Sequence, residues 1–150
     1  MEKITIKAMV NAPKQKVWDY YTQPQHITKW NFADPSWHCP RATIDLKIGG
    51  RYLARMEAKD GSFGFDFDAV YIEILEGENF TYEIGGRLAT VEFEEINGQT
   101  EVTITFDPET VHPIEMQRNG WQSIIKTLYD DQQKTYCRIV SPAGFFWPGR

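Results

Sequence analysis

Two pairs of carboxylates have the spacing that acid and base chemistry requires. Asp66 and Asp68 are two positions apart, as are Glu92 and Glu94, so on a strand each pair projects from one face. If buried, such carboxyls could act as a general acid and a general base. Surface carboxylates greatly outnumber tuned ones, so the favoured interpretation is two solvent-exposed faces. Apolar residues on both faces of residues 63–75 leave open which face of that strand is turned inward.

Histidines and cysteines predict no further reactive cluster. His26, His38 and His112 are not spaced to share a face, and Cys39 and Cys137 belong to no CxxC pair or Cys/His group. The sequence also lacks the motifs GxSxG, GxGxxG, GxxxxGK and HExxH. We therefore predict no metal, no cofactor and no catalytic residue set, and we place a binding function ahead of an enzymatic one.

Length and composition predict one globular domain. The 150 residues are 41% hydrophobic, 14% aromatic and 25% charged, which excludes disordered, collagen-like and membrane-spanning classes. A net charge of −5 without a cluster of Lys and Arg argues against nucleic acid as a partner. No secretory signal is visible at the start of the sequence, so we expect a cytoplasmic protein without a membrane partner, as a monomer or a homodimer.

Turn signals between runs of β-branched and aromatic residues predict the sheet that would position these groups. The turns are Gly49-Gly50, Asp60-Gly61, Gly77-Glu78, Gly85-Gly86 and Asn97-Gly98. Together with an alternating segment at the start, they predict seven antiparallel strands, at residues 4–10, 43–47, 51–58, 63–75, 80–84, 88–96 and 100–106.

Three helices are predicted around this sheet. Pro13 and Pro24 each begin a short helix, and residues 32–41 form a predicted loop. A seven-residue apolar repeat predicts a long helix from 114 to about 134, about 30 Å in length, which can lie along the sheet. The resulting fold is α+β, with a curved antiparallel sheet wrapped around the long C-terminal helix.

The predicted domain covers residues 1–136, and residues 137–150 form an irregular tail. Pro142, Gly144, Pro148 and Gly149 prevent both helix and strand in this tail, which also carries an aromatic cluster at 145–147. A tail that folds back onto the domain is favoured over a plug or a partner-binding segment, because apolar tails need cover in water.

The aromatic residues predict a ligand cavity. Large rings on several elements must meet in one small domain, and most of them form the core. A curved sheet closed by one long and two short helices nevertheless leaves space at its mouth, where ligand pockets occur. The predicted cavity residues are Trp30, Trp37, Arg55, Phe65, Asp66, Phe67, Tyr71, Arg87, Phe93, Gln117, Trp121 and Ile125.

Several short runs of residues carry a family resemblance. They are Val17-Trp18, Thr22-Gln23-Pro24, Trp30-Asn31, Asp45-Leu46 with Gly49-Gly50, Lys59-Asp60-Gly61-Ser62 with Phe65-Asp66-Phe67, and Gln117-Arg118 with Gly120-Trp121. In this order, over about residues 4–128, the chain resembles the activator of heat-shock-protein-90 ATPase homologue family, within the START-like, helix-grip group called SRPBCC. The resemblance implies a hydrophobic pocket between the sheet and the long helix.

Three functions follow as expectations. Members of the wider group bind lipids, hormones and polyketides, so the first is binding of a hydrophobic small molecule, a lipid or a metabolite. The family name comes from a co-chaperone, so the alternative is a protein-interaction module that stimulates a chaperone ATPase through its acidic surface. An enzyme with Asp66 or a neighbouring carboxylate as general base ranks third.

Overall fold

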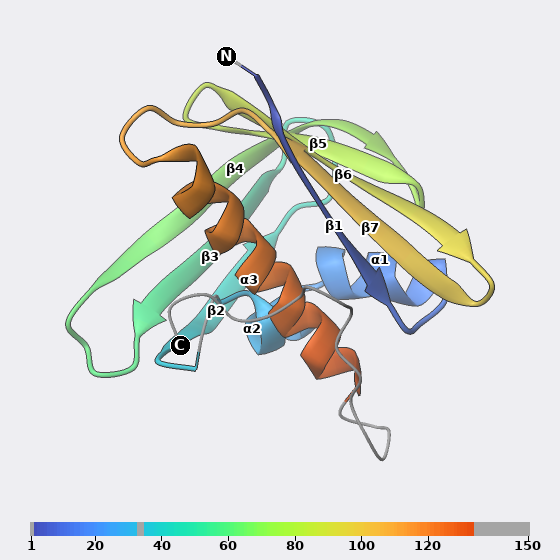
Figure 1. Ribbon diagram of the computed structural model, residues 1–150, viewed down its shortest axis with the longest axis horizontal. Helices are drawn as coiled ribbons and strands as arrows, with labels where there is room; N and C mark the ends of the chain where they lie inside the picture. Colours follow the sequence, from blue (N-terminus) through green and yellow to red (C-terminus); the bar gives the residue numbers. More distant parts are fainter. Residues whose placement is uncertain (1, 33–34, 134–150) are drawn as a thin grey trace.

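A single antiparallel sheet with three helices on its concave side makes up the computed structural model, which describes residues 2–32 and 35–133 (Figure 1). The elements are β1 (Ile4–Val10), α1 (Lys14–Thr22), α2 (Pro24–Trp30), β2 (Trp37–Ile44), β3 (Arg51–Ala58), β4 (Gly64–Leu75), β5 (Asn79–Ile84), β6 (Arg87–Ile96), β7 (Gln99–Phe106) and α3 (Ile114–Gln133).

The seven strands are arranged in the order β1-β7-β6-β5-β4-β3-β2, so β2 to β7 form a meander and β1 pairs with β7. Two-residue hairpins connect β5 to β6 and β6 to β7. In the second of them, Asn97 and Gly98 have φ angles of 53° and 81°, and positive φ at both central residues matches the twist of the strands. The α+β fold predicted from turn signals is confirmed, with β1 and β2 as the two edges of the sheet.

The predicted loop at residues 32–41 was wrong in its second half. Strand β2 begins at Trp37 and ends at Ile44, whereas the sequence predicted a strand at 43–47. Pro40 argues against a central strand, but β2 is an edge strand, and its register with β3 shifts between His38 and Arg41. This bulge accommodates the residue without an N–H, so pairing continues on both sides of it.

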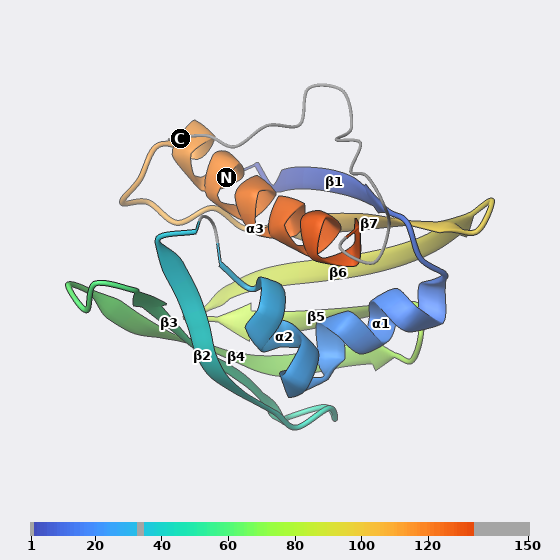
Figure 2. The ribbon, with the colours of Figure 1, turned by 90° about the horizontal axis from the view of Figure 1, so that it is seen from below.

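Side chains of α3 hold this helix beside the edge strand β1. Arg118 Nη1 donates to the carbonyl of Thr5 at 3.1 Å, and Gln122 Nε2 donates to the carbonyl of Lys7 at 3.2 Å. Thr127 Oγ1 donates to the carbonyl of Phe32 at 2.7 Å, which joins α3 to the segment after α2. Figure 2 shows α3 beside β1 and β7, with α2 and α1 lower in the view, in front of β5.

Aromatic side chains fill the space between α1 and the sheet. Trp18 contacts Phe80 and Phe93 edge-on, with ring centroids 5.9 and 5.4 Å apart, and Phe93 also contacts Tyr21 at 5.5 Å. Phe80 is fully buried. We call Trp18, Phe80 and Phe93 the α1 cluster, and this part of the domain is a packed core.

One sequence expectation concerns a part of the chain that the structure does not describe. The tail at 137–150, including Cys137, lies outside the described residues. Among the helices that are described, none combines the length and hydropathy that a membrane span needs.

Candidate functional site

A pocket of about 630 Å³ lies between the first half of α3 and the concave face of the sheet. Its volume is within the range of small-molecule sites, about 300–1,000 Å³. Apolar and aromatic side chains dominate the wall. The lining residues are Tyr21, Trp30, Asn31, Trp37, Tyr52, Met56, Phe65, Asp66, Phe67, Asp68, Tyr82, Ile84, Arg87, Ile104, Glu109, His112, Met116, Gln117, Gly120, Trp121 and Ile124.

Strand alternation positions the sheet side of this wall. In the register of β3 with β4, Met56 pairs with Phe65 and Ala54 with Phe67, so these residues share the concave face. Tyr82 on β5 continues the same face, with its ring centroid 5.8 Å from that of Phe67. Neighbouring strands thus direct their large side chains toward α3.

Trp121 forms the centre of the helix side of the pocket. Its ring stacks on Phe106 of β7 with centroids 4.3 Å apart and planes 16° apart, and it meets Phe67 of β4 edge-on at 6.3 Å. Gly120, beside it on α3, has no atom within 4 Å of the place where a Cβ would lie. The pocket therefore extends to the helix backbone at Gly120.

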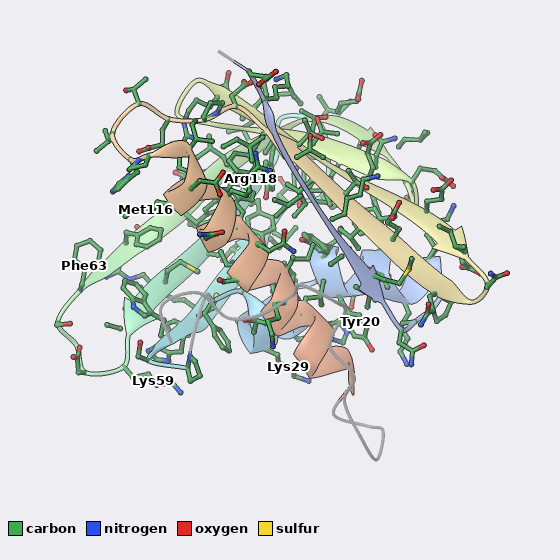
Figure 3. The ribbon with its side chains drawn as sticks, viewed as in Figure 1. Tyr20, Lys29, Lys59, Phe63, Met116 and Arg118 are labelled. Carbon is green, nitrogen blue, oxygen red and sulfur yellow. The ribbon has the colours of Figure 1, made fainter. Side chains whose placement is uncertain are left out.

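Exposed apolar side chains surround the mouth of the pocket. The Trp37 ring lies 5.9 Å from Phe63 and 6.1 Å from Phe65, and Phe63 and Phe65 are 61% and 43% exposed. Met116, at the start of α3, is 58% exposed. Figure 3 shows Phe63 and Met116 on the same side of the molecule. We call Trp37, Phe63, Phe65 and Met116 the rim.

The polar end of the pocket is held together by its own hydrogen bonds. Gln117 Nε2 donates to the carbonyls of Glu109 and His112 at 3.0 and 2.8 Å, and Gln117 Oε1 accepts from the N–H of Glu109 at 2.8 Å. The His112 N–H and imidazole beside the Glu109 carboxylate lower the pKa of that group. Arg87 Nη1 donates to the carbonyl of Asp107 at 3.2 Å. Gln117 thus clamps the loop before α3 to the helix.

Tyrosines form the buried side of the pocket. Tyr21, Tyr52 and Tyr82, which we call the floor tyrosines, are each at most 5% exposed. Burial raises the pKa of all three phenols well above its ordinary value, so they are neutral hydroxyl groups at physiological pH. The sequence analysis did not include them among the predicted cavity residues. Tyr52 and Tyr82 do lie on predicted strands, at positions that share a face with apolar residues.

Eight of the twelve predicted cavity residues line the pocket: Trp30, Trp37, Phe65, Asp66, Phe67, Arg87, Gln117 and Trp121. Four do not belong to the lining. Phe93 is part of the α1 cluster, and Tyr71 and Ile125 are also buried in the core. Arg55 lies on the convex face, where its register partner is Asp66. Whether the eight contact a ligand remains a prediction.

The carboxylates of Asp66 and Asp68 do not provide an acid and base pair. Both residues border the pocket, but their side chains lie on the convex face in ion pairs: Asp66 Oδ1 is 3.4 Å from Arg55 Nη1, and Asp68 Oδ1 is 3.1 Å from Arg51 Nε. They are 58% and 44% exposed. Glu92 and Glu94 are exposed as well. The general-base hypothesis therefore loses its candidates.

Metal ligands do not gather in the described part of the chain either. No three side chains of the types His, Cys, Asp and Glu among the described residues come together as a ligand set. The Cys39 thiol is buried, and burial raises its pKa to about 11, so it is a neutral thiol.

Solved structures show the same fold. An AHSA1-like protein from Aeromonas hydrophila is 33% identical with a TM-score of 0.82, over 93% of this chain and 99% of that one. A protein from Cytophaga hutchinsonii is 40% identical with a TM-score of 0.75, over 89% of this chain and 93% of that one. A protein from Nitrosomonas europaea, at 20% identity and a TM-score of 0.76 over 90% and 97% of the two chains, shares the fold.

A family model locates the resemblance in the sequence. Residues 11–130 match the model described as activator of Hsp90 ATPase homolog 1-like protein, which includes both short helices, β2 to β7 and the pocket half of α3. No curated protein matches the chain. The matched segment covers most of the described residues, so the chain belongs to the activator of Hsp90 ATPase homolog 1-like family.

Proposed function

We propose that this protein binds an apolar small molecule, such as a lipid or an aromatic metabolite, in the pocket between α3 and the sheet. The observation that carries the proposal is a pocket of about 630 Å³ with many aromatic side chains in its wall, in a domain whose α1 cluster is closely packed. Trp121 meets Phe67 across the pocket, and an apolar ligand would fill the remaining space beside these rings.

Access to the pocket supports the same proposal. The exposed rim places apolar side chains next to the pocket lining, where an apolar ligand would enter. Affinity would come from the apolar area removed from water, and the few polar wall groups would set orientation.

Titration with a panel of apolar ligands, read by native mass spectrometry and tryptophan fluorescence, tests the proposal. Trp30, Trp37 and Trp121 line the pocket, so we expect bound ligand to change the emission. Gly120→Leu places a side chain in the open space beside α3 and should abolish binding.

A matched variant separates filling of the pocket from a general effect on α3. Glu115→Leu adds the same side chain to the same helix at a residue outside the pocket lining, with a side chain 77% exposed, and should leave binding unchanged. Equal binding by wild type and Gly120→Leu would place the ligand elsewhere and overturn the proposal.

Stimulation of a chaperone ATPase is the second candidate function, favoured by membership of a family named for that activity. The test is the ATPase rate of an Hsp90 chaperone with and without the purified protein. A raised rate supports this function, and an unchanged rate without complex formation rejects it. The Gly120→Leu variant should leave any stimulation unaffected if the interaction surface lies outside the pocket.

A further inference from the structure

The floor tyrosines bring three hydroxyl groups to one buried region of the pocket. Tyr21 comes from the end of α1, Tyr52 from β3 and Tyr82 from β5. The Tyr52 and Tyr82 rings are 5.5 Å apart, and Tyr21 lines the same pocket. Elements distant in sequence thus bring three buried phenols to the wall of one pocket.

These hydroxyls have no partner within the described part of the protein. No hydrogen bond between described residues involves the hydroxyl of Tyr21, Tyr52 or Tyr82. Among those residues, the hydroxyls that are both sealed from solvent and without a partner belong to Tyr71 and Ser123. The floor hydroxyls are not sealed in this way, so they reach the pocket surface as available donors.

The surroundings decide what such donors can bind. A phenol that burial keeps protonated donates its O–H, and a buried donor without an acceptor costs free energy that a bound acceptor recovers. Arg87 and His112, the basic side chains of the lining, lie at the polar end of the pocket with Glu109, whose carboxylate supplies a compensating negative charge. A neutral oxygen fits this floor better than a carboxylate, whose charge would lose its hydration without a cation.

We propose that the hydroxyls of the floor tyrosines bind a neutral acceptor oxygen, such as a ketone or ester carbonyl, at the buried end of an otherwise apolar ligand. This inference rests on the proposed function and specifies its ligand class. The ligand enters with its carbonyl end first and leaves its apolar end toward the rim.

Two naphthalenes of nearly the same shape test this inference. 2-Acetylnaphthalene carries a ketone where 2-ethylnaphthalene carries a methylene, and both are titrated by calorimetry into wild type and into Tyr52→Phe and Tyr82→Phe. Each substitution keeps the ring and removes one hydroxyl. We expect the ketone to lose about 3- to 10-fold in affinity per variant, the range of one hydrogen bond, and the hydrocarbon to change less than about 2-fold.

Tyr71→Phe is the matched control. It removes a hydroxyl from the same aromatic neighbourhood, 6.2 Å from Tyr82 between ring centroids, at a residue that does not line the pocket. It should leave the affinity for both naphthalenes unchanged. A 13C label on the ketone carbonyl gives a second readout. In Tyr52→Phe, the carbonyl chemical shift of the bound ketone should move toward its value in a solvent that donates no hydrogen bond. In Tyr71→Phe it should not move.

The outcomes separate the two proposals. If wild type binds both naphthalenes, and the floor substitutions weaken both equally or weaken neither, the apolar pocket stands and the acceptor site is overturned. Failure of wild type to bind either naphthalene would reject the proposed function, and the acceptor site with it. A loss of affinity for the ketone alone in the floor variants supports both the proposed function and the acceptor site.

Discussion

The two halves of the concave face contain similar side chains and differ in their packing. At the α1 cluster, Trp18, Phe80 and Phe93 interlock and are at most 4% exposed. Under α3, the rings of the rim and the floor surround a pocket. Aromatic content therefore does not decide where a cavity forms. The position of the covering helix decides it, because α3 is bonded to the backbone of β1, and its backbone lies close to β1 and α2 but not to β3 and β4, which it reaches through side chains such as Trp121.

The largest expected difference between the halves is in stability. Phe80→Ala should lower the free energy of unfolding by about 3–5 kcal/mol, because it empties a fully packed site. Phe65→Ala should lower it by about 1 kcal/mol, because the ring is already partly exposed. Denaturant unfolding of both variants measures the difference. Equal losses would show that the pocket wall is packed as tightly as the α1 cluster.

Gln117→Leu tests the clamp at the polar end of the pocket. It removes three hydrogen bonds between α3 and the preceding loop, and we expect a loss of about 1–2 kcal/mol in the free energy of unfolding. Gln122→Leu, which removes one bond to β1, should cost less. Hydrogen exchange of the amide of Glu109 should accelerate in Gln117→Leu alone. Unchanged exchange there would mean that the loop does not depend on the clamp.

A gain in stability is expected from Gly120→Ala. The new methyl group enters open space, and alanine favours the helix over glycine by about 0.5–1 kcal/mol. Asn119→Ala, at an exposed neighbour on α3, should stabilise the helix by a similar mechanism. Thermal unfolding measures both gains. Ligand affinity should change for Gly120→Ala only, and a loss of stability in this variant would mean that the space beside α3 is not open.

The smallest effect concerns pH. The folded-state pKa of Glu109 is lowered, so its carboxylate adds stability above the unfolded-state pKa and loses this contribution as the pH falls through the folded-state value. The difference in unfolding free energy between wild type and Glu109→Gln should therefore favour wild type at pH 7 and decline below about pH 4. Unfolding curves at several pH values check this sign. A difference that grows in acid would contradict it.

Most of the fold could be predicted from the sequence, because turn residues and the alternation of apolar residues are local signals. Positive φ at Asn97 and Gly98, for example, follows from the residue types themselves. The start of β2 was missed because Pro40 normally ends a strand, and only the edge position of β2 and its bulge make room for it. That position depends on the pairing of the whole sheet.

The site was predictable only in part. Alternation placed Phe65 and Phe67 on one face of β4, and both line the pocket. The same reasoning could not separate Tyr71 and Phe93 from them, because the distinction depends on which part of the face lies under α1. The convergence of the floor tyrosines is a long-range property of three elements, which no local pattern encodes.

The bulge in β2 has a consequence for how this protein behaves at high concentration. An open sheet has edges that can recruit a strand from another molecule and so seed fibres. Strand β2 is the edge next to the apolar rim, where such recruitment would be most damaging. Pro40 offers no N–H to an incoming strand, and the register shift distorts the ladder beside it. We therefore expect the apolar rim to stay exposed to water without strand addition at β2.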